Sequence, residues 1–316
     1  MAQQKARRKP GDAGRYGDRP LQHSKRLSHH CFPNRGHVYA RSFLYTSFIS
    51  HERSAVMELS ELNNITLGCM GFSYKTWKGT FYPESIDQKD LLPSYAERFN
   101  SVEVDSTWYF TPRKSTVQRW YEVTPEGFTF TAKVPKNITH EKRDMRECVD
   151  DFVKFVEPML ELKEKLRCLL FQFPYGFTYT KNAEAFAEFL AELPKDVRYA
   201  VEMRNRKWLN EDYFSLLREH NVAHVLQEYP KMPRDIILTA DFSYVRILGD
   251  RYHYEAKHGE DFSQLRESYD DDLRYWAEKI AELALPVLVY FNNHFEGHSP
   301  ETLRRFHRLI RDITGE

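Results

Sequence analysis

The feature that most constrains the fold is a regular alternation of short β-type segments with longer amphipathic segments, which begins near Ile65 and continues to the C-terminus. Eight segments rich in Val, Ile, Phe and Tyr predict strands, at residues 65–70, 101–107, 128–134, 168–173, 198–203, 223–227, 244–248 and 287–291. Segments with apolar residues at helical spacing predict the helices between them, at residues 89–99, 116–122, 146–166, 182–193, 210–220, 269–283 and 300–313. The connection from the sixth to the seventh strand is irregular, and residues 236–240 are predicted as a short extra strand.

Strands that alternate with helices predict a parallel sheet covered by helices. Eight such units close into a single (β/α)8 TIM barrel in roughly 250 residues, which agrees with the length of the domain expected at residues 57–316. An open doubly wound sheet is the alternative, and it usually carries GxGxxG after the first strand. The sequence there is GCMGFSYKTWKG, which does not match, so the barrel is the preferred prediction.

Residues 1–56 differ from the rest of the chain in composition. They contain 11 Lys and Arg but only three acidic residues, a net charge of +8, and they show neither helical nor alternating periodicity. We expect this segment to lie outside the fold. It has the composition of a basic tail or a transit peptide, and a mis-assigned start codon is the favoured interpretation because Met57 lies eight residues before the first predicted strand.

The barrel region carries the opposite charge, with 35 basic and 43 acidic residues after residue 56, a net charge of −8. Such a balance disfavours nucleic acid as a partner, because non-specific binding depends on neutralising phosphates. The four cysteines are scattered without CxxC spacing, which argues against a zinc ribbon or a disulfide framework and favours a reduced, cytoplasmic protein. No apolar run approaches the length of a membrane span, so no membrane association is expected.

Polar side chains cluster at the C-terminal ends of the predicted strands, where TIM barrels place their active sites. Side chains two residues apart share one face of a strand, so these residues are expected to converge on one mouth. The strand ends contribute Glu103, Asp105, Lys133, Gln172, Glu202, Arg204, Arg246, Asn292, Asn293 and His294. His140 follows the third strand in a loop, and Tyr74, Trp77 and Tyr109 follow the first two strands.

The chemistry of these side chains suggests separate roles. We expect catalytic roles for Glu202, Glu103, Asp105 and His140. We expect substrate-binding roles for Lys133, Arg204, Arg246, Gln172, Asn292, Asn293, His294, Tyr74, Trp77 and Tyr109, with the cations holding an anion and the aromatic rings stacking on a sugar or a base. The alternative for the charged residues is a structural ion network that closes the barrel.

The sequence identifies no cofactor. HxH and HExxH spacings are absent, and three cations in the same mouth would compete with a divalent metal, so no metal ligands are predicted. A GxSxG nucleophile elbow is also absent, which argues against Ser-His-Asp catalysis.

Several longer segments resemble one known family in the order in which they occur. These are GFSYKTWKGTFYP (71–83), LLPSYAERFNSVEVDSTWYFTP (91–112), FTFTAKVPKNITH (128–140), LLFQFP (169–174), VEMRNRKW (201–208), YVRILG (244–249) and VYFNNHFEG (289–297). Together they resemble the YecE-like family, the domain of unknown function numbered 72, over nearly all of residues 65–313.

The resemblance implies a β/α barrel but no activity. It implies site positions at Glu103, Lys133, His140, Gln172, Glu202, Arg204, Arg246, Asn292 and Asn293. Two residues depart from the family pattern: Asp105 stands where the family more often has Asn, and Phe72 stands where it more often has Trp.

Three functions remain open from the sequence. The favoured one is an enzyme, of hydrolase or lyase type, that acts on a small anionic or sugar-containing substrate. A metal-dependent nuclease or repair enzyme is the second, and a non-catalytic barrel that binds a ligand or a partner is the third.

Overall fold

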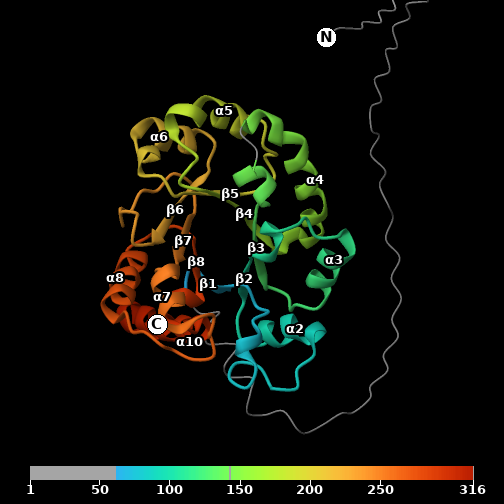
Figure 1. Ribbon diagram of the computed structural model, residues 1–316, viewed down its shortest axis with the longest axis vertical. Coiled ribbons are helices and arrows are strands. Elements are labelled where there is room, and N and C mark those ends of the chain that lie inside the picture. The colour runs from blue at the N-terminus through green and yellow to red at the C-terminus, as the bar shows by residue number, and fades with distance from the viewer. Residues whose placement is uncertain (1–61, 142–143, 316) are drawn as a thin grey trace, which may run out of the picture. The chain divides into compact units, whose positions relative to one another are not determined.

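The computed structural model describes residues 62–141 and 144–315, and the predicted extension at residues 1–56 lies outside them. The eight strands form a closed parallel barrel in sequence order, and β8 pairs with β1 to close it. The strands are β1 (Ile65–Met70), β2 (Ser101–Val104), β3 (Thr129–Lys133), β4 (Leu166–Phe173), β5 (Tyr199–Met203), β6 (Ala223–Glu228), β7 (Ser243–Ile247) and β8 (Val287–Phe291). The predicted TIM barrel is therefore confirmed (Figure 1).

Helices surround the strands on the outside of the barrel (Figure 1). They are α2 (Leu91–Ala96), α3 (Lys114–Glu122), α4 (Val149–Met159), α5 (Tyr179–Ala191), α6 (Glu211–Glu219), α7 (Arg251–His258), α8 (Asp270–Ala281), α9 (Asn293–Glu296) and α10 (Ser299–Thr314). Proline at the start of α10 is tolerated because the first N–H groups of a helix have no intrahelical partner. None of the helices in the described part of the chain is long and apolar enough to cross a membrane.

Three elements differ from the sequence prediction. The helix predicted at residues 146–166 is divided into η5 (Met145–Cys148), α4 and η6 (Leu160–Lys165), with Lys163 at a positive φ of 50°. Helix α7 was not predicted. The strand predicted at residues 236–240 is wrong, because Thr239 instead bonds the start of β6 through its side chain: its Oγ1 accepts from the His224 N–H and donates to the Val222 carbonyl.

Two apolar layers result from the alternation of side chains along the strands. The larger layer lies between the strands and the helices, and it includes Val102, Val104, Val201, Met203 and Val245. The smaller layer includes Met70, Cys168, Leu170, Ala200, Val225, Tyr244 and Tyr290. Its strand residues alternate with those of the outer layer, so they fill the interior of the barrel beneath its mouth.

The loops after β7 and β8 approach each other closely at Gly249. This glycine has a φ of +71°, and a Cβ atom there would lie 2.6 Å from both the His294 carbonyl oxygen and the Phe295 Cα. Only glycine combines this backbone conformation with such a close approach. Gly249 therefore fixes the position of the His294 backbone at the mouth of the barrel.

Candidate active site at the barrel mouth

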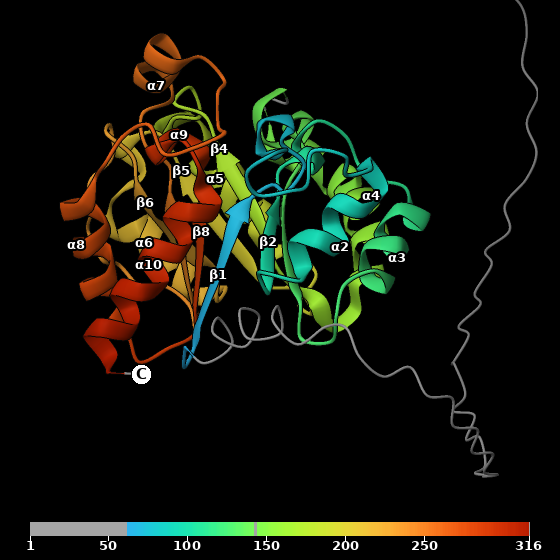
Figure 2. The ribbon, with the colours of Figure 1, turned by 90° about the horizontal axis from the view of Figure 1, so that it is seen from below.

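A pocket of about 1070 Å³ lies at the C-terminal ends of the strands. Helix α7 stands on the same side of the barrel (Figure 2). The polar side chains that line the pocket include Asp105, Lys133, His140, Gln172, Arg204, Arg246, Asn292 and His294. The aromatic side chains that line it include Tyr74, Trp108, Tyr109, Tyr229 and Tyr252. The volume is sufficient for a small-molecule ligand, and the position is that of the active site in TIM-barrel enzymes.

Beneath this pocket, Arg246 on β7 pairs with Glu103 on β2 and Glu202 on β5. Its Nη2 lies 2.6 Å from Glu103 Oε1, and its Nη1 lies 2.6 Å from Glu202 Oε2. Both carboxylates are fully buried, and Arg246 is 2% exposed. We call these three residues the buried ion cluster. Because removal from water is costly, each charge in it depends on its partners.

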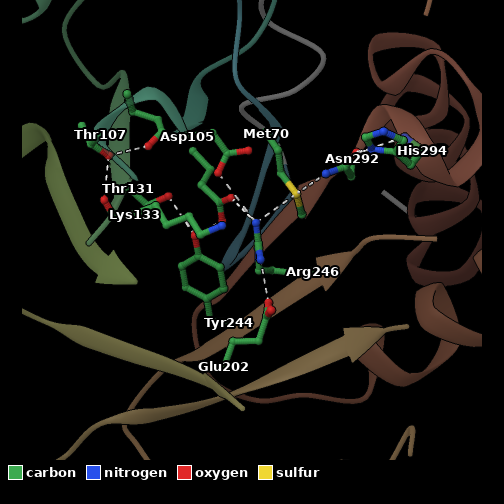
Figure 3. Close-up of polar contacts among 12 residues, drawn as sticks. Met70, Asp105, Thr107, Thr131, Lys133, Glu202, Tyr244, Arg246, Asn292 and His294 are labelled. Carbon is green, nitrogen blue, oxygen red and sulfur yellow. Dashed lines mark hydrogen bonds and ion pairs between the residues drawn. The ribbon is translucent and has the colours of Figure 1, made fainter. Parts of the chain in front are cut away.

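Further side chains complete the hydrogen bonding of the cluster (Figure 3). Tyr244 donates to Glu103 Oε2 over 2.6 Å and shares a second hydrogen bond of 2.9 Å with Thr131. Arg246 Nη2 also lies 3.3 Å from the sulfur of Met70. Every carboxylate oxygen of the cluster has at least one donor, since Arg204 Nε lies 2.5 Å from Glu202 Oε1. The four carboxylate oxygens of the cluster are therefore all hydrogen-bonded, whereas Arg246 Nε is buried without a hydrogen-bond partner among the described residues.

The pKa values of the two buried carboxylates, Glu103 and Glu202, are shifted in opposite directions. Burial raises the pKa of Glu103 to about 7, although Arg246 opposes this change. Burial also acts on Glu202, but there Arg204 and Arg246 outweigh it and lower the pKa to about 2. A carboxylate with such a low pKa is a weak base, so Glu202 suits a structural role better than proton abstraction.

Lys133 is half-buried at the end of β3 and lines the pocket. Its Nζ lies 5.2 Å from the centroid of the Trp108 ring, on which the ring of His140 also packs at 5.2 Å. Burial lowers the pKa of Lys133, the charge of Asp105 opposes this change, and Arg246 lowers the pKa further. The pKa of His140 falls to about 4, through burial and then through Lys133 and Arg204, so this imidazole is neutral at pH 7.

Arg204 presents a cation to the pocket from the end of β5. Its Nε is bonded to Glu202, and its guanidinium lies 4.1 Å from the centroid of the Tyr229 ring, which holds it by a cation–π contact. Its terminal nitrogens make no hydrogen bond to another described residue. A planar guanidinium with free donors is well suited to bind a phosphate or a carboxylate.

Asp105 directly follows β2 and faces the pocket. Its side chain is 31% exposed, and its Oδ1 lies 3.8 Å from Arg246 Nη2. This oxygen is buried but accepts no hydrogen bond from the described residues. Since buried polar atoms normally have partners, Asp105 has an acceptor available for a bound ligand.

The segment after β8, which continues into α9, contributes Asn292 and His294 to the pocket lining. Asn292 Oδ1 accepts from the His294 N–H and lies 2.7 Å from its Nδ1, while His294 Nε2 lies 3.0 Å from Glu255 on α7. Burial lowers the pKa of His294, although Glu255 opposes this. Both ring nitrogens of His294 are thus occupied, which fits a positioning role.

Several predicted site residues lie away from the pocket. Glu103 and Glu202 lie below its floor in the buried ion cluster. Trp77 and Asn293 were expected to bind substrate, but both are buried beside α10 instead: the Trp77 indole donates to Asn293 Oδ1, which also accepts from the Ser299 N–H. Arg246 lines the pocket, but its terminal nitrogens are held by the two carboxylates.

The remaining predicted residues line the pocket. Tyr74 bonds the Met70 carbonyl and leaves part of its ring exposed to the pocket, whereas Tyr109 is 67% exposed at the rim. Gln172 lines the pocket beside Glu202, with which it is in register. The described residues include no group of three or more His, Cys, Asp and Glu arranged to hold a metal ion.

Three residues were missed by the sequence reasoning. Tyr244 shares its strand face with Arg246, two residues away, so the alternation rule already pointed to it. Tyr229 follows β6, and its position directly after a strand was the available signal. Glu255 belongs to the unpredicted helix α7, so the sequence offered no signal for it.

Comparison with known proteins identifies relatives along most of the barrel. A sequence profile of the family described as "Protein of unknown function DUF72" matches residues 66–315. UPF0759 protein YecE of Escherichia coli K12 is 28% identical over 249 residues, which cover 70% of this chain and 85% of that protein. UPF0759 protein YunF of Bacillus subtilis is 24% identical over 258 residues, covering 73% and 90% respectively.

Solved structures of related proteins share the fold. A DUF72 family protein of Thermotoga maritima is 27% identical, with a TM-score of 0.65, and the match covers 80% of this chain and 99% of that one. A DUF72 family protein of Enterococcus faecalis superimposes with a TM-score of 0.63 at 24% identity, covering 80% and 96%.

Proposed function

We propose that this chain, which belongs to the DUF72 family of TIM-barrel proteins, is an enzyme of hydrolase or lyase type that acts on a small anionic or sugar-containing substrate. The observation that carries the proposal is the set of side chains that face the mouth pocket. Arg204 offers positive charge, Lys133 offers an amine, Asp105 offers a carboxylate oxygen that accepts no hydrogen bond from the described residues, and His140 offers a neutral imidazole. These are the groups that acid–base chemistry on an anion requires.

The buried ion cluster supports this reading because it fixes the residues above it. Glu202 holds Arg204 from below, and Arg246 lies 3.8 Å from Asp105. Catalytic groups must be held by a rigid supporting layer to act efficiently. Both terminal nitrogens of Arg246 and all four carboxylate oxygens of the cluster are already bonded within it or to Arg204 and Tyr244, so we assign the cluster to positioning and assign the chemistry to Lys133, Asp105 and His140.

A thermal-shift screen of the full-length protein tests the proposal. The ligands are sugar phosphates, sugar acids, neutral sugars, nucleotides and short oligonucleotides, each with and without divalent metals. A ligand present at about a hundred times its dissociation constant adds about 2.7 kcal/mol of stability, which shifts the melting temperature measurably. We expect shifts with small anions that Arg204→Ala abolishes.

Arg206→Ala is the matched control for this experiment. Arg206 lies two residues further along the chain, is exposed, and bonds the Lys231 carbonyl outside the pocket lining. This variant should keep the ligand-induced shift. Shifts only with oligonucleotides and metals would favour the nuclease alternative, and binding without turnover would favour a non-catalytic barrel.

A further inference from the structure

Lys133 and Lys165 occupy contrasting environments. Lys165 is buried, and its Nζ donates to the carbonyl oxygens of Tyr121 and Thr124 and to Thr124 Oγ1, at 2.7, 2.8 and 3.0 Å. These bonds use all three ammonium donors, as expected for a structural lysine. The Nζ of Lys133 makes no hydrogen bond and no ion pair within residues 62–141 and 144–315, and it rests against the Trp108 ring.

Two of the three carboxylates near Lys133 are bonded to other side chains, and the third, Asp105, forms no ion pair with it. Glu103 is held by Arg246 and Tyr244, and Glu202 is held by Arg246 and Arg204. Lys133 therefore projects from β3 toward the cluster (Figure 3) without sharing its bonds. A half-buried amine that forms no ion pair loses its proton more easily, and burial lowers the pKa of Lys133 although the charge of Asp105 opposes this. The neutral amine is the nucleophilic form.

We propose that Lys133 forms a Schiff base with the carbonyl carbon of a small aldehyde or ketone, and that an anionic group of the same molecule binds Arg204. This inference rests on the proposed function and names its substrate class as anionic carbonyl compounds. The Lys133 nitrogen forms a bond to the carbonyl carbon, and the carbonyl oxygen leaves as water with the two amine hydrogens. A C=N bond replaces the C=O bond, and neither oxidant nor reductant is consumed.

The neighbouring side chains fit the proton transfers of this step. Asp105 has a buried oxygen that accepts no hydrogen bond from the described residues, and His140 is a neutral imidazole that packs on the same Trp108 ring as Lys133. Both line the pocket with Lys133. Arg204 lines the same pocket, so the amine and the anion-binding guanidinium face one cavity.

Borohydride trapping tests the inference on the full-length protein. The probes are glyoxylate, pyruvate and glyceraldehyde 3-phosphate, and glycerol 3-phosphate serves as the matched anion without a carbonyl. Reduction turns a Schiff base into a stable amine, which intact mass spectrometry and peptide mapping then locate. We expect one adduct per chain, on Lys133, with at least one carbonyl probe and none with glycerol 3-phosphate.

Three variants make the test specific. Lys133→Arg keeps the positive charge but cannot form the adduct, so trapping should be lost while the melting temperature is retained. Lys75→Arg alters an exposed lysine of the same pocket lining and should be trapped like the original protein. Arg204→Ala should reduce trapping about tenfold at low probe concentration, because a charge-assisted hydrogen bond to the anion is lost.

The outcomes separate this inference from the proposed function. Adducts spread over exposed lysines, or equal trapping in Lys133→Arg, would overturn the inference. If glycerol 3-phosphate raises the melting temperature through Arg204 but no carbonyl probe is trapped, the pocket binds anions as proposed and the Schiff base is wrong. If no probe is trapped and no anion shifts the melting temperature, both proposals are wrong.

Discussion

Tyr244 donates a hydrogen bond of 2.6 Å to the Oε2 atom of Glu103 across the interior of the barrel. The two residues lie on β7 and β2, which are not neighbouring strands. The bond therefore spans the interior and connects strands that have no backbone ladder in common.

Removing this bond should be costly because its acceptor is a buried carboxylate. We expect Tyr244→Phe to lower the free energy of unfolding by about 1.5–3 kcal/mol, the range for hydrogen bonds to charged groups. Tyr290→Phe is the control, since Tyr290 packs beside Tyr244 but bonds the neutral Ser101 hydroxyl at 2.8 Å. That variant should cost about 0.5–1.5 kcal/mol. Equal losses in urea denaturation would contradict the special role of Glu103.

Arg246 should matter more for stability than Arg204. Arg246→Ala leaves Glu103 and Glu202 without their shared buried counter-ion, and we expect a loss of about 3–5 kcal/mol. Arg204→Ala leaves Glu202 paired with Arg246, so its loss should be smaller. Chemical denaturation of both variants measures the difference, and a larger effect at Arg204 would refute the assignment of the buried ion cluster to structure.

The low pKa of Glu202 predicts acid sensitivity. Its pKa is about 2 in the folded protein, below the ordinary value of 4.5, so its contribution is present above pH 4.5 and is lost as the pH falls towards 2. The contribution amounts to about 3 kcal/mol. Denaturation midpoints between pH 2 and 5 should therefore fall steeply in the original protein and less in Glu202→Gln. Parallel curves would show that Glu202 does not cause the loss.

Glu103 should produce the opposite pH dependence. Its pKa of about 7 lies above the ordinary value of 4.5, so the folded protein retains a proton that the unfolded chain releases. The contribution of Glu103 to the free energy of unfolding is therefore fully present below pH 4.5, and it is lost as the pH rises through 7. Glu103→Gln should flatten the stability profile between pH 5 and 7.5, and an unchanged slope would assign the decline to other groups.

Gly249 should be sensitive to the addition of a single methyl group. The Cβ atom of an alanine at this position would lie 2.6 Å from the backbone of His294 and Phe295. Its left-handed backbone conformation would cost a further 1–2 kcal/mol, roughly, of folding free energy. Gly127→Ala is the control, with a similar φ of +83° and open space around the new Cβ. We expect Gly249→Ala to cost more stability and to weaken ligand binding, as measured by thermal shift. Equal effects would mean that the loops adjust freely.

The barrel was predictable because its physical causes are local. Strand positions follow from apolar runs, and the parallel order follows from the helices between them. The break at Lys163 was not predictable, since a positive φ in a non-glycine residue depends on tertiary packing. Helix α7 was missed because RYHYEAKH buries mainly Tyr254, which leaves little apolar periodicity to detect.

The convergence of polar side chains on the mouth of the barrel was predictable from strand alternation. Which of them line the pocket and which are buried below it was not predictable. Glu103 and Asp105 are two residues apart on the same face, yet the first lies in the buried ion cluster and the second faces the pocket. Depth depends on strand tilt and stagger around the closed barrel. Trp77 and Asn293 were misplaced because the loop conformation, rather than the strand pattern, decides where they point.

The buried ion cluster also discriminates between alternative pairings of the strands. Its members come from β2, β5 and β7, so its bonds form only when all three strands have the correct register. A slip of one residue in any of these strands would turn its charge towards the apolar layer under the helices. An unpaired buried charge costs several kcal/mol. A barrel with a shifted strand would bury such a charge without a counter-ion or hydrating water, so it would be less stable than the correctly paired barrel.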